Sequence, residues 1–247
     1  MSKRYSNKGY NARKAAQEQP KTNKAALITA LVTIFLGVFI VISVAVAIGI
    51  ASNSDKPKTE VNMTEVQNEI NSFKVSDFTE SKQETEYVKL TVKDYGEIVI
   101  RLRPDVAPTT VKNFQKLVKN GHFSGKIFHR VIQNFMIQGG GFDGTGTQHK
   151  ADTIKGEFES NGVQNDLLHV RGVISMARTG LDKNSGSNQF FICDKTSSHL
   201  DGDYAAFGYV LAGMDTVDKI AAVNTDGNDK PLENVIIESA TFVTPLK

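Results

Sequence analysis

The sequence of 247 residues contains a single cysteine, Cys193, so the chain cannot form an intramolecular disulfide. A fold without disulfides depends on its hydrophobic core, and this chain is long enough to build one. Cys193 lies between Ile192 and Asp194 in an apolar strand pattern. Burial is therefore a better interpretation than a reactive thiol, which needs an exposed and electropositive setting.

Charge is missing from one long run, residues 25–52, which contain no Asp, Glu, Lys or Arg. The run exceeds the ~20 residues that a helix needs to cross the hydrocarbon layer, so it predicts a transmembrane helix. A cleaved signal peptide is the alternative, but its apolar region usually has only ~7 to 15 residues, and no small-x-small cleavage site ends this run. No cysteine directly follows the run, which excludes a lipoprotein-type anchor.

The segment before the apolar run is basic. Its charged residues are Lys3, Arg4, Lys8, Arg13, Lys14, Lys21 and Lys24, opposed only by Glu18. The positive-inside rule then places the N-terminus in the cytoplasm and the rest of the chain outside. The segment carries a net charge of +6, so the total of +2 leaves −4 for the remainder. An acidic remainder is not a basic nucleic-acid binder, and orienting the helix explains the basic segment with fewer assumptions than an RNA or lipid patch.

Several catalytic motifs are also missing. The chain has no GxSxG and no HExxH motif, and its five histidines show no ligand spacing, so no metal site is predicted. Residues 139–144 match GxGxxG, but a polar stretch follows where a dinucleotide fold needs a helix. We therefore predict no cofactor.

Composition divides the chain into four parts. Residues 1–24 are the basic cytoplasmic tail, 25–52 the transmembrane helix, 53–84 a polar tether and 85–247 a folded domain. The tether has too few apolar residues for a core of its own, although residues 63–70 could form one short amphipathic helix.

The folded domain begins with a period-two pattern. Val88, Leu90 and Val92 alternate with polar residues, and after Asp94-Tyr95-Gly96 the alternation resumes, which predicts a hairpin. Helical windows follow from Pro108 to Gly121 and around residues 214–221, and a strand is expected at 235–243. Between them lie short strands separated by Gly-, Asn- and Asp-rich turns. This order favours a closed β-barrel with helices over its ends.

The most informative segment is FHRVIQNFMIQGGG, residues 128–141. It places Arg130 and Gln138 among large apolar side chains, and a lone cation is costly to desolvate there unless something binds it. Strand alternation puts Met136 and Gln138 on one face, and likewise Gln189 and Phe191. The alternative is that the apolar residues are ordinary core and the amides cap the barrel rim.

Two further segments are GVISMARTG, residues 172–180, and NQFFICDKTSSHLDG, residues 188–202. With all three in this order, the chain from about Thr85 onward resembles the cyclophilin family of peptidyl-prolyl cis/trans isomerases, in a bacterial membrane-anchored form. The resemblance implies a mainly β fold, namely a closed eight-stranded antiparallel barrel capped by two helices.

The resemblance also implies roles for site residues. Arg130 would be the catalytic donor to the proline nitrogen, and Gln138 would orient its guanidinium. The substrate-binding residues would be Phe135, Met136, Gln138, Ala177, Arg178, Gln189, Phe191, His199, Leu200 and Tyr204. At Ala177 and Arg178 the family holds the substrate backbone, so an arginine in place of the usual Asn should be tolerated. His199 stands where many eukaryotic members have Trp, and Tyr204 where they have a pocket His, so we expect cyclosporin to bind weakly.

The function expected from these features is isomerisation of X-Pro bonds in newly exported proteins, which assists their folding, without cofactor, metal or nucleic acid. A binding module that holds proline-containing polypeptides without turning them over is the main alternative, and Arg130 favours the enzyme. A purely structural barrel would leave the three segments unexplained.

Overall fold

The computed structural model describes residues 60–246 of the 247. They belong to a compact unit that spans Lys58–Lys247. The predicted tail, 1–24, and the predicted transmembrane helix, 25–52, lie outside the described residues and stay predictions. Within residues 60–246, every helix is too short or too polar to cross a bilayer.

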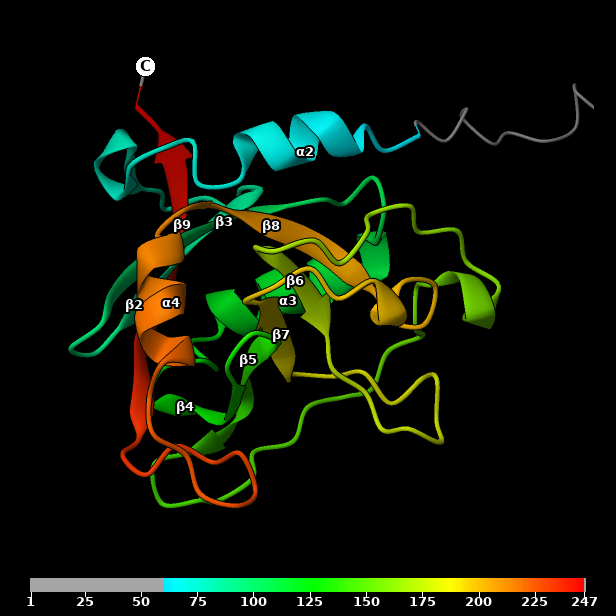
Figure 1. The fold of residues 1–247 in the computed structure, drawn as a ribbon. Coiled ribbons are helices and arrows are strands. Elements are labelled where there is room, and N and C mark those ends of the chain that lie inside the picture. Colours follow the sequence, from blue (N-terminus) through cyan, green and yellow to red (C-terminus); the bar gives the residue numbers. More distant parts are fainter. Residues whose placement is uncertain (1–59, 247) are drawn as a thin grey trace, which may run out of the picture. The chain divides into compact units, whose positions relative to one another are not determined.

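The domain is a closed antiparallel barrel of eight strands (Figure 1). The strands are β2 (Tyr87–Val92), β3 (Gly96–Leu102), β4 (Lys126–Ile132), β5 (Met136–Asp143), β6 (Val173–Met176), β7 (Phe190–Cys193), β8 (Ala206–Ala212) and β9 (Val235–Pro245). Their order is β9-β2-β3-β8-β6-β7-β5-β4, and pairing of β4 with β9 closes the ring. This confirms the predicted barrel.

The predicted hairpin is β2 and β3. Tyr87 pairs with Arg101 and Val92 with Gly96, so the alternating apolar residues share one face. Asp94 and Gly96 have positive φ angles, which the tight connection requires. The alternation in the sequence thus places Val88, Leu90 and Val92 inside the barrel, where all three are buried.

Two helices lie where the pattern predicts them. Helix α3 (Pro108–Lys119) begins with Pro at its first turn and is followed by Gly121 at a positive φ. The buried Glu157 carboxylate accepts hydrogen bonds from the backbone N–H groups of Thr109 and Thr110 and so caps its N-terminus. Helix α4 (Met214–Ala221) buries Val217 and Ile220 against the barrel.

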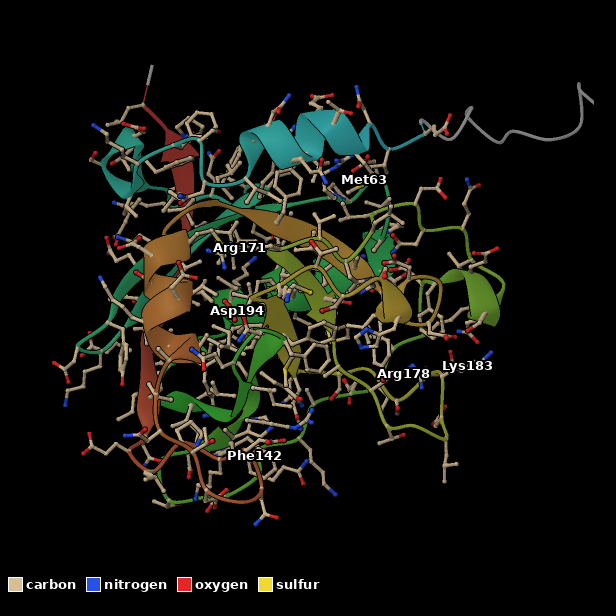
Figure 2. The ribbon with its side chains drawn as sticks, viewed as in Figure 1. Met63, Phe142, Arg171, Arg178, Lys183 and Asp194 are labelled. Atoms are coloured by element: carbon tan, nitrogen blue, oxygen red, sulfur yellow. The ribbon has the colours of Figure 1, made fainter. Side chains whose placement is uncertain are left out.

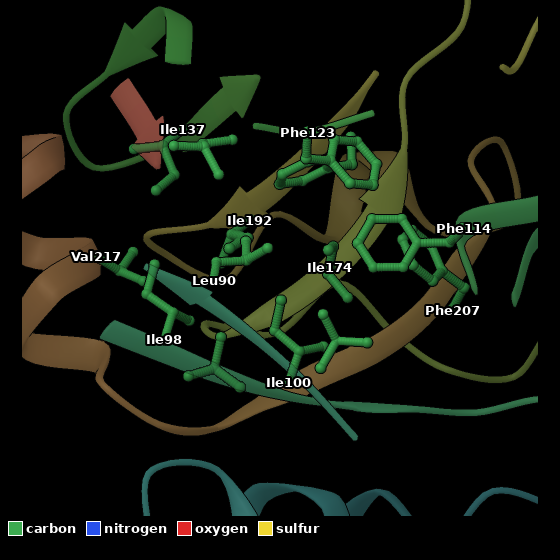
Figure 3. Packing of buried hydrophobic residues seen from close by; sticks show 14 of the residues in the cluster. Leu90, Ile98, Ile100, Phe114, Phe123, Ile137, Ile174, Ile192, Phe207 and Val217 are labelled. Carbon is green, nitrogen blue, oxygen red and sulfur yellow. The ribbon is translucent and has the colours of Figure 1, made fainter. Parts of the chain in front are cut away.

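The barrel interior is filled by side chains from all sides (Figure 3). Ile137 from β5 and Ile192 from β7 meet Leu90, Ile98 and other apolar residues there. A packed interior leaves no room for a ligand. Because successive side chains of a strand point to opposite faces, the neighbours of Ile137 and Ile192 lie on the outer wall. A ligand site must therefore lie on the outside of the barrel.

A third helix was not predicted as a part of the domain. Helix α2 (Met63–Glu69) begins at Asn62, whose Oδ1 accepts hydrogen bonds from the N–H groups of Thr64 and Glu65. It packs on the outer wall of β3 and β8, with Val66 fully buried. The two-helix description of the sequence is thus incomplete, since the described residues contain three α-helices.

The chain after α2 continues along the barrel. A short 3-10 helix (Val75–Asp77) leads into β1 (Phe78–Glu80), which pairs with the end of β9. Backbone N–H groups of Asn71 and Phe73 donate to the carbonyls of Val210 and Leu211 in β8. Residues 61–80 were expected within the tether, and the structure instead packs them on the barrel. Their few apolar side chains suffice because the barrel wall supplies the other half of the contact.

Candidate active site

A cavity lies on the outer wall of the barrel, where β4, β5 and β7 meet the loops after β6 and β7. Its lining residues are Arg130, Phe135, Met136, Gln138, Ala177, Arg178, Phe191, Leu200 and Tyr204. All nine are among the predicted site residues. The structure therefore brings together residues from three separate segments of the chain.

The floor of the cavity is apolar. Met136, Phe191 and Leu200 are buried and form a cluster of their own with Cys193, separate from the barrel interior. Phe135 and Tyr204 pack against this cluster, and the rings of Phe191 and Tyr204 meet edge to face with centroids 5.8 Å apart. Cys193 is a free, fully buried thiol, and burial raises its pKa to about 12, as expected for an inert residue.

Arg130 stands at the edge of this floor. It lies on β4, whose register with β5 shifts on both sides of Phe128, and such irregularities re-aim the side chains of a strand. The guanidinium Nε donates to Asp229 Oδ2 over 3.2 Å, and both side chains are 43% exposed. Among the described residues nothing accepts a hydrogen bond from the two terminal nitrogens. These nitrogens are therefore available to a ligand.

Asp229 was missed by the sequence analysis. It lies on the loop between α4 and β9, has a positive φ, and accepts a hydrogen bond from the Val131 N–H through its carbonyl. The loop is thus fastened to β4 one residue beyond Arg130. No spacing pattern indicates a contact across 99 residues of sequence.

The two predicted amides form a pair. Gln138 lies opposite Arg130 in the β4–β5 ladder, and its Nε2 donates to Gln189 Oε1 over 3.0 Å. Gln189 does not line the cavity itself and holds Gln138 from behind. The acceptor that holds the guanidinium is Asp229, whereas the expected contact from Gln138 is directed to Gln189.

His199 lies just outside the lining, in a 3-10 helix (Ser198–Leu200). Its ring packs on Phe135 with centroids 5.3 Å apart and a tilt of 35°. It thus extends the apolar wall at the rim. Leu200, the next residue, turns into the cavity.

Arg178 contributes its side chain as well as its backbone. Its Cζ lies 4.5 Å from the centre of the Tyr204 ring and 5.4 Å from that of Phe158. The neighbouring Ala177 donates its N–H to the Gln189 carbonyl over 2.9 Å. The family resemblance predicts mainly a backbone contact at residue 178.

Phe191 is supported from behind by a histidine that the sequence analysis did not single out. The His169 ring stacks on Phe191, and its nitrogens lie 2.9 Å from Asp201 Oδ1 and 3.0 Å from Ser175 Oγ. Burial lowers the pKa of His169, although Asp201 opposes the shift, so the ring is neutral at pH 7. The Ser-His-Asp order resembles a hydrolase triad, but Ser175 is completely buried. No substrate reaches it, and the group supports the floor.

His129, next to Arg130, takes no part in the cavity. Its ring packs on Phe142 with centroids 4.6 Å apart, and its Nδ1 is buried without a hydrogen-bond partner among the described residues (Phe142 is labelled in Figure 2). Burial, and then the charge of Arg130, lower the pKa of His129 to about 4. His129 is therefore a packed, structural residue.

The arrangement has two guanidinium groups, Arg130 and Arg178, beside an apolar hollow and no nucleophile within it. In residues 60–246, no three His, Cys, Asp or Glu side chains gather closely enough to hold a metal ion. Such a site can grip an apolar ring and offer N–H donors to an adjacent acceptor.

Comparison with protein families gives one match over most of the domain. Residues 87–242 match the family model described as cyclophilin type peptidyl-prolyl cis-trans isomerase/CLD. This is more than half of the chain.

Individual relatives agree. The chain is 40% identical to a peptidyl-prolyl cis-trans isomerase of Schizosaccharomyces pombe, over 59% of this chain and 92% of that protein. It is 49% identical to one of Acinetobacter baylyi, over 53% and 69%. It is 37% identical to one of Arabidopsis thaliana, over 71% of this chain but only 29% of that longer protein.

Solved structures show the same fold. A cyclophilin type peptidyl-prolyl cis-trans isomerase of Cryptosporidium parvum superposes with a TM-score of 0.56 at 27% identity, covering 66% of this chain and 99% of that one. The same protein, crystallised in the presence of the dipeptide Ala-Pro, gives a TM-score of 0.54 over 63% and 97%.

Proposed function

The chain belongs to the cyclophilin-type peptidyl-prolyl cis-trans isomerase family, whose members isomerise X-Pro bonds, and we propose that it does so in exported proteins, with Arg130 as the catalytic donor. The observation that carries this proposal is the cavity in which Arg130 borders an apolar floor. The related protein crystallised with Ala-Pro supports proline-containing peptides as ligands.

Isomerisation of an X-Pro bond requires little more than such a cavity. Rotation about the X-Pro bond has a barrier of ~18 to 20 kcal/mol because amide resonance is broken, and no bond is made or cut. As the amide twists, the lone pair of the proline nitrogen becomes an acceptor. A donor that binds only the twisted state lowers the barrier directly.

Different residues bind the proline ring, donate to the twisting amide and contact the substrate backbone. Met136, Phe191 and Leu200 form a hydrophobic seat for the proline ring. Asp229 engages the Nε edge of Arg130, which leaves the terminal N–H groups for the twisting amide. Gln138, held by Gln189, can contact the substrate backbone beside them.

A protease-coupled isomerisation assay on the full-length chain tests this function. We expect acceleration of the cis-to-trans step of a proline peptide, with loss of acceleration in Arg130→Ala. Binding of the peptide without any acceleration would favour the binding-module alternative.

We also propose that the domain is held outside the cell membrane by residues 25–52, with the N-terminus in the cytoplasm. The support is the uncharged run and the basic residues before it. Protease added to intact cells should remove the domain and leave the N-terminal segment protected. A domain that resists protease until the membrane is lysed contradicts this topology, and with it the choice of exported proteins as substrates.

Cyclosporin should bind weakly, because His199 stands at the rim on Phe135 in place of a larger indole. A central aromatic anchor is worth roughly 2 kcal/mol or more, and each 1.4 kcal/mol is about a decade. His199→Trp should therefore tighten binding at least about tenfold by titration. Tight binding by the native protein, unchanged in the variant, contradicts this account.

A further inference from the structure

The guanidinium of Arg178 is held in one position at the wall of the cavity. Its Nε donates to the Asp203 carbonyl over 3.0 Å, and its Nη1 donates to the carbonyls of Thr179 and Gly180 over 2.9 and 3.4 Å. The rings of Tyr204 and Phe158 lie against its plane. A long side chain held by three carbonyls and two rings has already lost its conformational entropy.

The groups that hold Arg178 are all neutral. Backbone carbonyls and aromatic faces orient a guanidinium but do not cancel its charge. Among the described residues no carboxylate oxygen lies within 4.0 Å of its nitrogens. Asp203 offers its backbone carbonyl, and the nearby Asp182 and Asp201 accept from Asn184 and His169 instead. Arg130, in the same cavity, is paired with Asp229.

The charge of Arg130 is therefore compensated by a carboxylate, whereas the charge of Arg178 is not. Of the nitrogens of Arg178, Nη2 has no acceptor among the described residues. Arg178 lines the same cavity as Phe191 and Leu200, so a residue next to a bound proline is within reach of its side chain. A carboxylate there would form a charge-assisted hydrogen bond and complete the ion pair.

We propose that Arg178 selects substrates in which an acidic residue flanks the proline, on either its N-terminal or its C-terminal side. The inference rests on the proposed isomerase function and adds a substrate class to it. It assigns to the Arg178 side chain a role in specificity, distinct from the rate enhancement assigned to Arg130.

The effect should be modest because Arg178 is partly exposed to solvent. Solvent-exposed ion pairs are weak, and a preorganised guanidinium lies at the upper end of their range. We expect a preference of about three- to fivefold in kcat/KM for an acidic residue over its amide. Salt should weaken this preference, because it screens exposed charges.

The experiment measures ratios within each protein. Peptides that differ only by Glu or Gln, placed directly before or directly after the proline, are assayed with the full-length chain at low salt and at about 0.5 M NaCl. The native chain should give a Glu/Gln ratio of about three to five at one position at least, and the ratio should fall towards one in high salt.

Variants locate the source of the preference. Arg178→Gln should bring the ratio to about one, whatever its overall activity, and Arg178→Lys should retain part of it. Lys183→Gln is the matched control: it removes a charge from the same loop, but Lys183 donates to the Ser160 carbonyl and does not line the cavity (Figure 2). Its ratio should equal that of the native chain.

The inference is overturned if native protein and Arg178→Gln show the same ratio, or if Lys183→Gln removes the preference equally. A native ratio that does not respond to salt also overturns it, and this readout stands even if Arg178→Gln does not fold. A chain that turns over neither Glu nor Gln peptides overturns the isomerase function itself. The experiment therefore distinguishes a missing preference for acidic residues from a missing isomerase activity.

Discussion

Two arginines on the outer wall of the barrel show how differently one chain can use the same side chain. Arg101 lies on the outer wall of β3, under α2, and its Nη1 donates to both oxygens of Glu69, over 2.9 and 2.7 Å, and to the Tyr209 hydroxyl. Arg130 lies on the wall of the cavity and contacts Asp229 through Nε only. Arg101 is held within its own chain, with its Nε buried and unpaired among the described residues, whereas Arg130 keeps both terminal nitrogens unpaired at the cavity.

The pKa shifts of Arg101 and Glu69 reflect their ion pair. Burial lowers the pKa of Arg101, but the hydrogen bond and charge of Glu69 outweigh this and raise it. Burial likewise raises the pKa of Glu69, and hydrogen bonds from Tyr209 and Arg101 more than reverse the shift. An arginine with its own carboxylate and hydroxyl stabilises the fold. An arginine with unused N–H groups beside an apolar floor is suited to act on a ligand.

The largest effect should come from Arg130→Ala. Removing a preorganised donor to developing charge costs ~3 to 4 kcal/mol, so kcat/KM should fall by roughly 10² to 10³. Arg130→Lys should rescue only partly, because an ammonium lacks the planar fork. The assay is protease-coupled isomerisation at several peptide concentrations.

Phe191→Ala provides the contrast within the cavity. It removes part of the apolar seat, so it should weaken peptide binding along with rate. If Arg130→Ala folds normally and keeps near-native turnover, the assignment of Arg130 is wrong.

The second effect should appear in stability and leave the chemistry unchanged. Glu69→Ala deprives Arg101 and Tyr209 of their shared acceptor, and a lost charged hydrogen bond costs about 1.5 to 3 kcal/mol. Partial exposure places the loss in free energy of unfolding nearer to 1 kcal/mol, measured by urea denaturation. kcat/KM should stay native. Asp215→Ala, which breaks the exposed Lys219–Asp215 ion pair, is the comparison. If both variants lose the same free energy of unfolding, the Glu69–Arg101 pair stabilises the fold no more than an exposed pair does.

The segment that packs over Arg101, residues 61–80, also shows what the sequence pattern does not predict. Strong alternation at Val88, Leu90 and Val92 predicts a barrel strand with no other information. Residues 61–80 carry only scattered apolar side chains such as Val66 and Phe78, which do not show a core of their own. They are stable because β3, β8 and β9 offer a complementary surface, and this surface exists only after the barrel has formed.

A third effect, of similar size, concerns the partner of Arg130. Asp229→Asn keeps the shape but removes the charge that holds Nε, and we expect a loss of about fivefold in kcat/KM, or ~1 kcal/mol. A positioning role predicts that Asp229→Asn adds almost nothing when Arg130 is already Ala. Independent, additive losses in the double variant would show that Asp229 acts on something other than Arg130.

The last effect is on pH dependence. The pKa of His129 is about 4 in the fold, against an ordinary 6.5, because of burial and then the charge of Arg130. Between these values the unfolded chain binds a proton that the folded chain does not. Stability from this group is therefore full above pH 6.5 and declines as the pH falls towards 4.

Thermal unfolding of the native chain and of His129→Gln at pH 7 and pH 5 tests this. The loss of Tm on acidification should be smaller in the variant. An identical loss in both would mean that His129 is protonated as easily in the fold as outside it.

At the cavity itself, the predicted residues were those with a local motif. Nine of them line one cavity, and the alternation of β5 and β7 explains why Met136, Gln138 and Phe191 face outward there. Asp229 and His169 were missed, since each is brought to the site by a loop contact that leaves no periodic signal. The side chain of Gln138 was expected to contact the guanidinium, but it donates to the Gln189 amide oxygen instead.

The long strand β9 determines when the barrel can close during synthesis. Among the strands of residues 60–246, β9 alone pairs with both β2 and β4, and it also pairs with β1 (Figure 1). During synthesis the earlier strands emerge with two unpaired edges, and the ring cannot close until residues 235–245 arrive. Contacts between such distant parts of a chain form slowly. The protein should therefore acquire protease resistance in a single late step, after its last strand is made.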